Sequence, residues 1–213
     1  MMARADAPPR GRVRRRLTVA ARREQLIRLG MEMFSTRPYD EIWIEEIAEL
    51  AGVSRGLLYH YFPTKRDFYV AVTRAAAADV GEATEPDPGL PPTQRLQAGI
   101  DAFLQQAERR SHGFLTAYRG TLASDAEVRA IVEDSRQRQA KRILDVVAGG
   151  RPISPLVQLA VQGWIAFAQG VTAQWLQERQ ASRDEVTRLL LGTLVGAVAA
   201  AAGEASTKRV RRA

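Results

Sequence analysis

The chain has no cysteine and only two histidines, His60 and His112, among its 213 residues. The lack of cysteine excludes a disulfide scaffold, a thiol nucleophile and a cysteine-ligated zinc or iron–sulfur site. Two imidazoles are too few for a histidine-based metal centre, and no nucleophile–base pair or phosphate-binding loop stands out. We therefore expect neither an enzyme nor a protein that carries a metal or another cofactor.

Long apolar runs are also missing. The longest, residues 189–202, has 14 residues interrupted by glycine and threonine, whereas a membrane-spanning helix needs about 20. The N-terminus carries arginine and proline where a secretory signal would need an apolar run. These features predict a soluble cytoplasmic protein with no membrane partner.

The net charge of +7 is concentrated at the two ends. Residues 1–16 contain six arginines and one aspartate, and residues 204–213 contain four basic residues and one glutamate. We expect residues 1–17 to form a basic arm, disordered without DNA, whose Arg14, Arg15 and Arg16 reach phosphates or a minor groove. Residues 204–213 form a second basic tail, for which contact with nucleic acid and simple solvation both stay open.

Apolar residues recur at helical spacing along most of the chain, and no segment keeps the alternation of a strand for long. The spacing predicts helices over residues 18–35, 65–80, 93–108, 112–122, 126–147, 155–180 and 183–203, besides two short ones within residues 43–62. Residues 81–92 contain four prolines and two glycines, and so predict a linker. The expected fold is all-α, with an N-terminal domain over residues 18–80 and a C-terminal domain over residues 93–203.

The two short helices predicted within residues 43–62 are joined by a tight turn. The first has one apolar face and ends at Gly52, because glycine accepts the left-handed conformation common at a helix C-terminus. Ser54 can cap the second helix by accepting a backbone N–H, and Pro63 cannot continue it. Such a pair is typical of the helix-turn-helix, whose second helix enters the major groove of DNA.

At these residues the chain resembles the TetR family of bacterial transcriptional regulators. The family pattern is IA-x-x-AGVS-x-G-x-LY-x-HF-x-x-K, which the chain matches at Ile47, Ala48, Ala51, Gly52, Val53, Ser54, Gly56, Leu58, Tyr59, Phe62 and Lys65. The resemblance covers about residues 18–80. It implies a DNA-binding module of three to four helices, followed by a helical bundle that binds a ligand and forms a dimer.

Trp43, Leu57 and Tyr61 depart from the family pattern, which more often has Ser or Thr, Thr and His at these places. The first two changes remove hydroxyl groups that could bind phosphate. Phosphate anchoring should therefore shift toward Tyr59, Tyr61, Lys65 and the arginine arm.

Arg55 begins the second motif helix and is the best candidate for a base contact. A guanidinium can bind guanine O6 and N7 with two hydrogen bonds, although a phosphate contact or a solvated surface position is an equal alternative. Gly56 would let the backbone approach the DNA, or serve helix packing. The remaining candidates for contacts with phosphate or a groove are Trp43, Ser54, Tyr59, His60, Tyr61 and Lys65. For Trp43, partial burial in the small domain is the alternative.

Small residues in the last two long helices indicate a dimer interface. Gly192, Gly196 and Ala200 fall at every fourth position. Gly163 and Gly170 reduce the side-chain volume on one face of the preceding helix. Small side chains let two helices approach closely. Packing within one chain is the alternative.

The resemblance also implies a small-molecule pocket in the C-terminal domain. Candidates for its apolar lining are Phe103, Phe114, Tyr118, Trp164 and Phe167, each of which could instead be ordinary core. Few charges accompany these side chains, so we expect a small hydrophobic effector.

The sequence thus predicts a homodimeric, sequence-specific repressor that binds a palindromic operator in double-stranded DNA. A small apolar effector would release it. The alternative is an effector-independent or broadly acting DNA-binding protein that uses its two basic tails.

Overall fold

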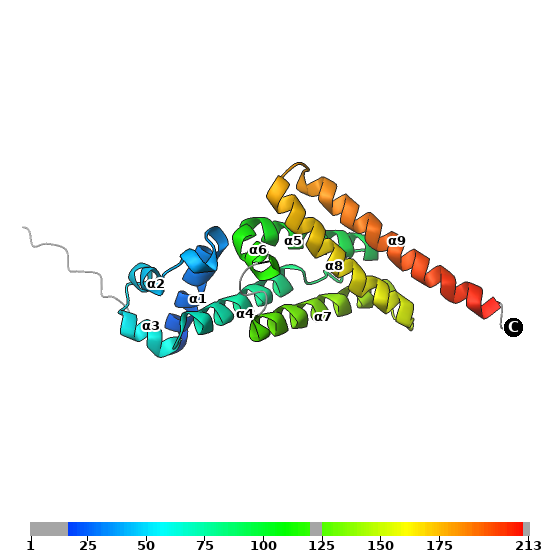
Figure 1. The fold of residues 1–213 in the computed structure, drawn as a ribbon. Helices are drawn as coiled ribbons and strands as arrows, with labels where there is room; N and C mark the ends of the chain where they lie inside the picture. Colours follow the sequence, from blue (N-terminus) through cyan, green and yellow to red (C-terminus); the bar gives the residue numbers. More distant parts are fainter. Residues whose placement is uncertain (1–16, 120–124, 211–213) are drawn as a thin grey trace, which may run out of the picture.

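The computed structural model describes residues 17–119 and 125–210, and the regular elements within these residues are all helices (Figure 1). For Arg119 and residues 204–210 only the backbone is described, and the predicted arm over residues 1–17 lies almost wholly outside the described residues. The α-helices are α1 Val19–Thr36, α2 Ile44–Ala51, α3 Arg55–Tyr61, α4 Lys65–Ala83, α5 Pro92–Arg109, α6 Ser111–Arg119, α7 Ala126–Ala148, α8 Pro155–Glu178 and α9 Arg183–Val210. A short 3-10 turn, η1 Tyr39–Glu41, precedes α2. The all-α prediction is confirmed.

Two helices are longer than the sequence predicted. Helix α4 continues to Ala83 rather than residue 80, so the extended connection to α5 is shorter than residues 81–92. Helix α9 continues through Val210, so most of the segment predicted as a basic tail is helical. The apolar pattern ends near residue 203, but alanine, lysine and arginine are good helix formers and carry the helix on.

The helix starts follow the caps in the sequence. Thr18 Oγ1 accepts the Ala21 N–H at 3.1 Å, and Ser54 Oγ accepts the Leu57 N–H at 3.2 Å, as predicted for Ser54. Thr64 and Asp67 form a reciprocal capping box at the start of α4. Gly52 ends α2 with φ +63°, in the left-handed conformation that glycine tolerates best.

The N-terminal core is built where α1 and α4 cross. Leu26, Phe34, Leu58 and Phe68 are almost fully buried in it. A Cβ placed at Gly30 would lie 2.5 Å from Phe68 Cζ, so the missing side chain lets α4 approach α1 closely. This packing fixes the platform on which α2 and α3 sit.

The C-terminal core lies mainly between α5, α8 and α9. Its most deeply buried side chains are Leu104, Val161, Leu190 and Leu194. Trp164 is buried beside them and donates its indole N–H to the Leu190 carbonyl at 3.0 Å. Figure 1 shows α4 running from the motif helices to the C-terminal bundle, so one helix belongs to both parts.

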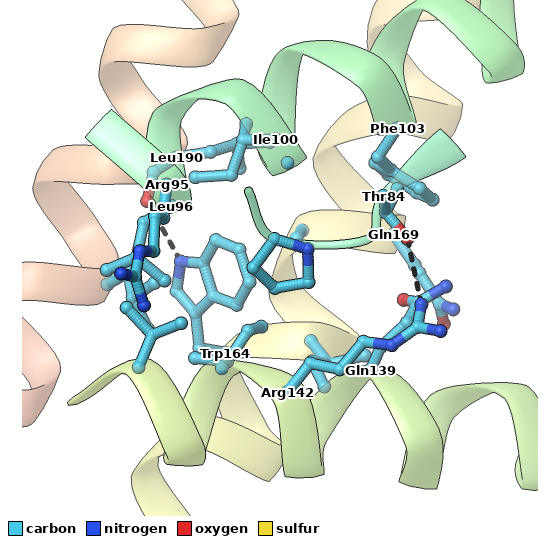
Figure 2. A pocket seen from close by; sticks show the side chains of 17 residues that line it. Thr84, Arg95, Leu96, Ile100, Phe103, Gln139, Arg142, Trp164, Gln169 and Leu190 are labelled. Carbon is cyan, nitrogen blue, oxygen red and sulfur yellow. Dashed lines mark hydrogen bonds between the residues drawn. The ribbon is translucent and has the colours of Figure 1, made fainter. Parts of the chain in front are cut away.

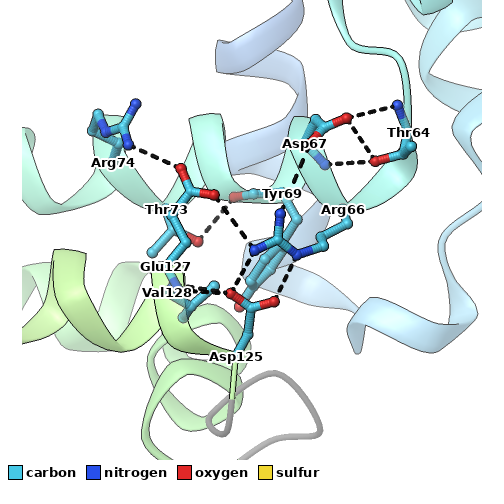
Figure 3. A network of polar contacts seen from close by, with 9 residues as sticks. All are labelled: Thr64, Arg66, Asp67, Tyr69, Thr73, Arg74, Asp125, Glu127 and Val128. Atoms are coloured by element: carbon cyan, nitrogen blue, oxygen red, sulfur yellow. Dashed lines mark hydrogen bonds and ion pairs between the residues drawn. The ribbon is translucent and has the colours of Figure 1, made fainter.

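An ion-pair network fastens the start of α4 to the start of α7 (Figure 3). Arg66 donates to both carboxylate oxygens of Asp125, from Nε at 2.7 Å and from Nη2 at 2.9 Å. Asp125 also caps α7, because its Oδ1 accepts the backbone N–H groups of Glu127 and Val128. Glu127 extends the network to Arg74 at 3.2 Å.

Candidate nucleic-acid interface and ligand cavity

Helix α3 has one buried side and one open side. Leu58 and Phe62 are fixed in the core, with exposed fractions of 0% and 2%, as the sequence indicated. Arg55, Tyr59 and His60 are exposed on the other side. A helix held by one face and free along the other can enter a major groove without disturbing the core.

Arg55 does not stand free on this open side. Its guanidinium forms an ion pair with Glu45 of α2, and its side chain is 67% exposed. Glu45 is therefore a part of the site that sequence reasoning missed. Any contact of this guanidinium with a base or a phosphate would compete with the carboxylate of Glu45.

Trp43 lies at the junction of η1 and α2 with 67% of its surface exposed. The covered part of Trp43 is the smaller one, which favours a surface role over its predicted alternative, partial burial in the small domain. The reason is local: Ile42 and Ile44 on either side of it point into the core, so Trp43 points out. The exposed indole is available to pack on a DNA backbone.

Arg37 and Glu46 hold Trp43 and the start of α2 in place. Arg37 Nη1 donates to Glu46 Oε2 at 2.6 Å, and Glu46 Oε1 accepts the Trp43 backbone N–H at 3.3 Å. The bond from Arg37 lowers the pKa of the Glu46 carboxyl below its usual value. No motif in the sequence singled out this pair, because its members lie nine positions apart on different elements.

His60, Tyr61 and Lys65 differ in solvent exposure and in their contacts within the module. His60 is exposed and meets the half-buried Tyr61 edge to face, with ring centroids 5.7 Å apart. Lys65 Nζ lies 4.3 Å above the Tyr39 ring, and partial burial lowers the pKa of its ammonium group. Lys65 is thus held against its own module, at the start of α4.

Two neighbouring cavities lie in and beside the C-terminal part. The smaller, about 70 Å³, lies between α5, α7, α8 and α9 and is lined by Trp164, Ile100 and Leu190 among others (Figure 2). The larger, about 170 Å³, is lined by Phe114 and Tyr118. Phe103, Gln139 and Gln169 line both, so the two spaces adjoin.

Four of the five predicted lining residues therefore border a cavity, and Phe167 does not. Phe167 is 43% exposed on the outer side of α8 and lines neither space. Its assignment was wrong because α8 is apolar on both sides, so its sequence does not reveal which side faces inward.

The larger cavity has walls from both parts of the molecule. Phe34 of α1 and Tyr69 and Val72 of α4 line it together with residues of α5, α6 and α7. Tyr69 meets Phe34 edge to face at 5.0 Å, and burial raises the pKa of its hydroxyl. The cavity thus touches the same two helices that form the platform for α3.

The sequence did not indicate the polar groups of this cavity. Arg136 donates from Nε to Gln169 Oε1 at 2.7 Å, and Arg110 donates from Nη2 to Asp79 Oδ2 at 2.6 Å. Arg110 follows the end of α5, and Asp79 lies on α4. Neither arginine stands in a motif, and only the tertiary fold brings them to the cavity.

Comparison with known proteins agrees with this layout. Residues 26–72 match the family described as bacterial regulatory proteins, tetR family, and residues 92–210 match the tetracyclin repressor-like C-terminal domain. The chain belongs to the TetR family. It is therefore a DNA-binding transcriptional regulator, and the family is non-enzymatic. The predictions of a DNA-binding regulator and of a protein that is not an enzyme are confirmed.

Individual TetR-family proteins show how broad the likeness is. A crystal structure of a tetR-family transcriptional regulator from Streptomyces coelicolor is 31% identical with a TM-score of 0.83, covering 92% of this chain and 89% of that one. The transcriptional activator FasR of Mycolicibacterium smegmatis is 27% identical over 180 residues, 81% of each chain. The transcriptional repressor KstR of Rhodococcus jostii is 24% identical over 172 residues, 80% of each. Activators and repressors thus both occur among the relatives.

Within this TetR-family fold, α8 and α9 carry an apolar surface that no part of the described chain covers. We call it the α8–α9 face; its large exposed side chains are Leu159, Phe167, Leu189 and Val195. Gly163, Gly192, Gly196 and Ala200 are exposed on the same two helices, and a Cβ added at any of these three glycines would meet nothing within 4 Å.

Gly170 is an exception among the predicted interface residues. It is half-buried, and a Cβ there would lie 3.4 Å from the Tyr118 hydroxyl of α6. For Gly170 this contact favours the alternative to a dimer interface, packing within one chain.

Residues 155–178 and 183–203 are each long and apolar enough to span a membrane, judged by length and composition alone. In this fold the two helices pack on each other and on α5. Core helices of soluble proteins pass the same test, and the family is one of soluble regulators.

Proposed function

We propose that the protein is a cytoplasmic homodimer that binds a palindromic operator and leaves it when a small apolar effector enters the larger cavity. Bound at a promoter, the dimer would exclude RNA polymerase. The observation that carries the proposal is the position of α4. This helix packs beneath α3 through Phe68 and lines the cavity through Tyr69 and Val72.

The DNA contacts would come from the open side of α3 and the residues before α2. Arg55 is the candidate for a base, and Tyr59, His60 and Trp43 are candidates for phosphate and groove contacts. Ser54 and Gly56 place the first amide groups of α3, to which phosphates are attracted. Tyr61 and Lys65 would act at the edge of this surface, and Arg14, Arg15 and Arg16 lie outside the described residues.

The dimer would form through the α8–α9 face. One helix-turn-helix covers a single half-site, so two-fold symmetry is the usual way to bind a full operator. Exposed Leu159, Phe167, Leu189 and Val195 surround positions where small residues leave room for close helix approach. Covering such a face removes apolar surface from water, the dominant favourable term in association.

Effector and DNA would be coupled through α1, α4 and α6. A Cβ added to Gly113 of α6 would lie 3.3 Å from the Phe34 carbonyl oxygen of α1, so α6 packs closely against α1 at this point. A ligand that displaces α6 or α4 must therefore shift the platform of α3. Such a ligand changes DNA affinity only by its difference in affinity for the two arrangements.

An effector-independent DNA-binding protein that relies on its basic ends is the competing function. The two differ in how affinity depends on sequence and salt. We would titrate the purified protein with a selected operator and with random duplex at several salt concentrations. The proposal predicts at least about a thousandfold preference for the operator. Equal affinity, with a steep salt slope for both duplexes, would favour the alternative.

A further inference from the structure

One of the arginines that line the larger cavity has a guanidinium nitrogen with no hydrogen-bond acceptor within the described part of the chain. Arg110 Nη1 is buried and unpartnered there, whereas Nη2 of the same guanidinium donates to Asp79 at 2.6 Å. Arg110 is among the residues that line this cavity. A buried N–H left without an acceptor costs free energy, and more so on a charged group.

The surroundings of Arg110 favour an anion as the missing partner. The described lining consists mostly of apolar and aromatic side chains, with a few hydroxyl and amide groups and no carboxylate. Arg136, the other lining arginine, already donates to Gln169 at 2.7 Å and lies 3.7 Å from Glu133. Of the two arginines that line this cavity, Arg110 is therefore the one with a buried nitrogen that lacks an acceptor in the described part of the chain.

We propose that the effector is an amphipathic anion with an apolar body and a single acid group, which Arg110 recognises through Nη1. The proposal rests on the effector function proposed above for the same cavity, and it adds an acid group to the apolar effector named there. Two oxygens of a carboxylate can accept from one guanidinium, and such charge-assisted hydrogen bonds are the strong class. The aromatic wall of Phe34, Phe103 and Phe114 would hold the apolar body.

Binding of the acid would also bear on Asp79. A ligand carboxylate and the Asp79 carboxylate would share one guanidinium, so each weakens the other's hold on it. Because Asp79 lies on α4, the acid group of the ligand acts directly on the helix that carries the platform of α3. Replacing Asp79 by asparagine removes the competing charge and should strengthen binding of the acid.

The test compares acids with alcohols of the same shape. Isothermal titration calorimetry of the full chain would use octanoate against octanol and 4-phenylbutyrate against 4-phenylbutanol, as alkyl and aryl probes. We expect the acid of at least one pair to bind about tenfold or more tightly than its alcohol. In Arg110→Gln this ratio should fall to about one, with the alcohol affinity unchanged. The matched control is Arg109→Gln, an exposed neighbour at the end of α5, which should keep the ratio.

Equal affinities in the unmodified protein, or no binding of either acid, would overturn the proposal. So would an acid preference that survives Arg110→Gln, because Arg110 would then not be the group that distinguishes acid from alcohol. That result is the one expected if Nη1 only holds a water molecule. If Arg110→Gln fails to fold, Asp79→Asn decides, and an unchanged ratio in it counts against the proposal. Operator binding is measured in the same preparations without ligand. If the unmodified protein does not bind an operator, the proposed regulator is refuted. If it binds an operator but shows no acid preference, only the anionic effector is refuted.

Discussion

Arg55 of α3 and Glu45 of α2 form an ion pair across the turn of the helix-turn-helix. The pair links the two motif helices and holds the side chain best placed to bind a base. Under the proposed base contact, the pair would also set a cost on DNA binding, because Arg55 would have to give up its bond to Glu45. Both side chains keep solvent contact, with exposed fractions of 67% for Arg55 and 31% for Glu45, so this cost is modest.

Glu45→Gln should therefore strengthen operator binding by roughly two- to fivefold, because exposed pairs contribute about 1 kcal/mol or less. Glu49→Gln is the control, since it removes the same charge from an exposed position on α2. Fluorescence anisotropy with a labelled operator measures both. In an Arg55→Ala background the gain from Glu45→Gln should shrink to that of Glu49→Gln, and an undiminished gain would show general charge repulsion instead.

The close approach of α1 and α4 makes Gly30 a sensitive position. Phe68 cannot move aside easily, because its ring is buried against Phe62 at a centroid distance of 4.9 Å. Gly30→Ala should lower the free energy of unfolding by about 1–2 kcal/mol, despite alanine's better helix propensity. Urea unfolding followed by circular dichroism measures this change.

Gly56→Ala is the matched control, since a Cβ at Gly56 meets nothing within 4 Å. This variant should be as stable as the parent or more stable by up to about 1 kcal/mol. Its operator affinity should fall if the backbone of α3 lies close to DNA. Equal stability losses in the two variants would contradict the packing account of Gly30.

The contact between Arg66 and Asp125 should make stability depend on pH in acid. Hydrogen bonds from Arg66, then from the Val128 backbone N–H, lower the pKa of Asp125 from 3.8 to about 2. A carboxyl with a lowered pKa stabilises the fold fully above its unfolded pKa, and this contribution is lost as pH falls through the folded pKa. The stability difference between the parent and Arg66→Gln should thus be constant above about pH 5 and shrink from about pH 4 toward about pH 2.

Urea unfolding at a series of pH values measures this difference. Arg138→Gln serves as control, because Arg138 pairs with Asp134 on the exposed side of α7 and should contribute little at any pH. A stability difference for Arg66→Gln that persists unchanged at pH 3 would mean that Asp125 is not the group responsible.

The sequence predicted α3 and the turn before it better than the rest of the site, because the signals for them are local. The cap at Ser54, the turn at Gly52 and the buried position of Leu58 depend on residues within one or two helical turns. The all-α fold likewise follows from periodicity. Domain boundaries and DNA contacts remain predictions.

What the sequence could not predict depends on contacts between distant elements. Arg66 and Asp125 are 59 positions apart, and Arg110 and Asp79 are 31 apart. Nothing local marks either pair. Trp164 and Phe167 show a second limit. Both lie on the apolar helix α8, and only tertiary packing decides that Trp164 faces inward and Phe167 outward.

The α8–α9 face should control self-association. Val195→Glu places a carboxylate at an exposed apolar position, and two-fold symmetry repeats it in both subunits. We expect dimerisation to weaken by at least about tenfold, because an unpaired charge would be buried. Sedimentation velocity measures the change, and Lys141→Glu on α7 should leave the dimer intact. A fully dimeric Val195→Glu would locate the interface elsewhere.

The central claim, that a dimer reads a palindrome with α3, is tested most directly by selecting DNA from a random pool with the purified protein and with Arg55→Ala. The account predicts an enriched sequence with two inverted half-sites, and loss of preference at one base pair in each half-site for Arg55→Ala. Selection of no sequence, or the same preference at every position in both proteins, would contradict it.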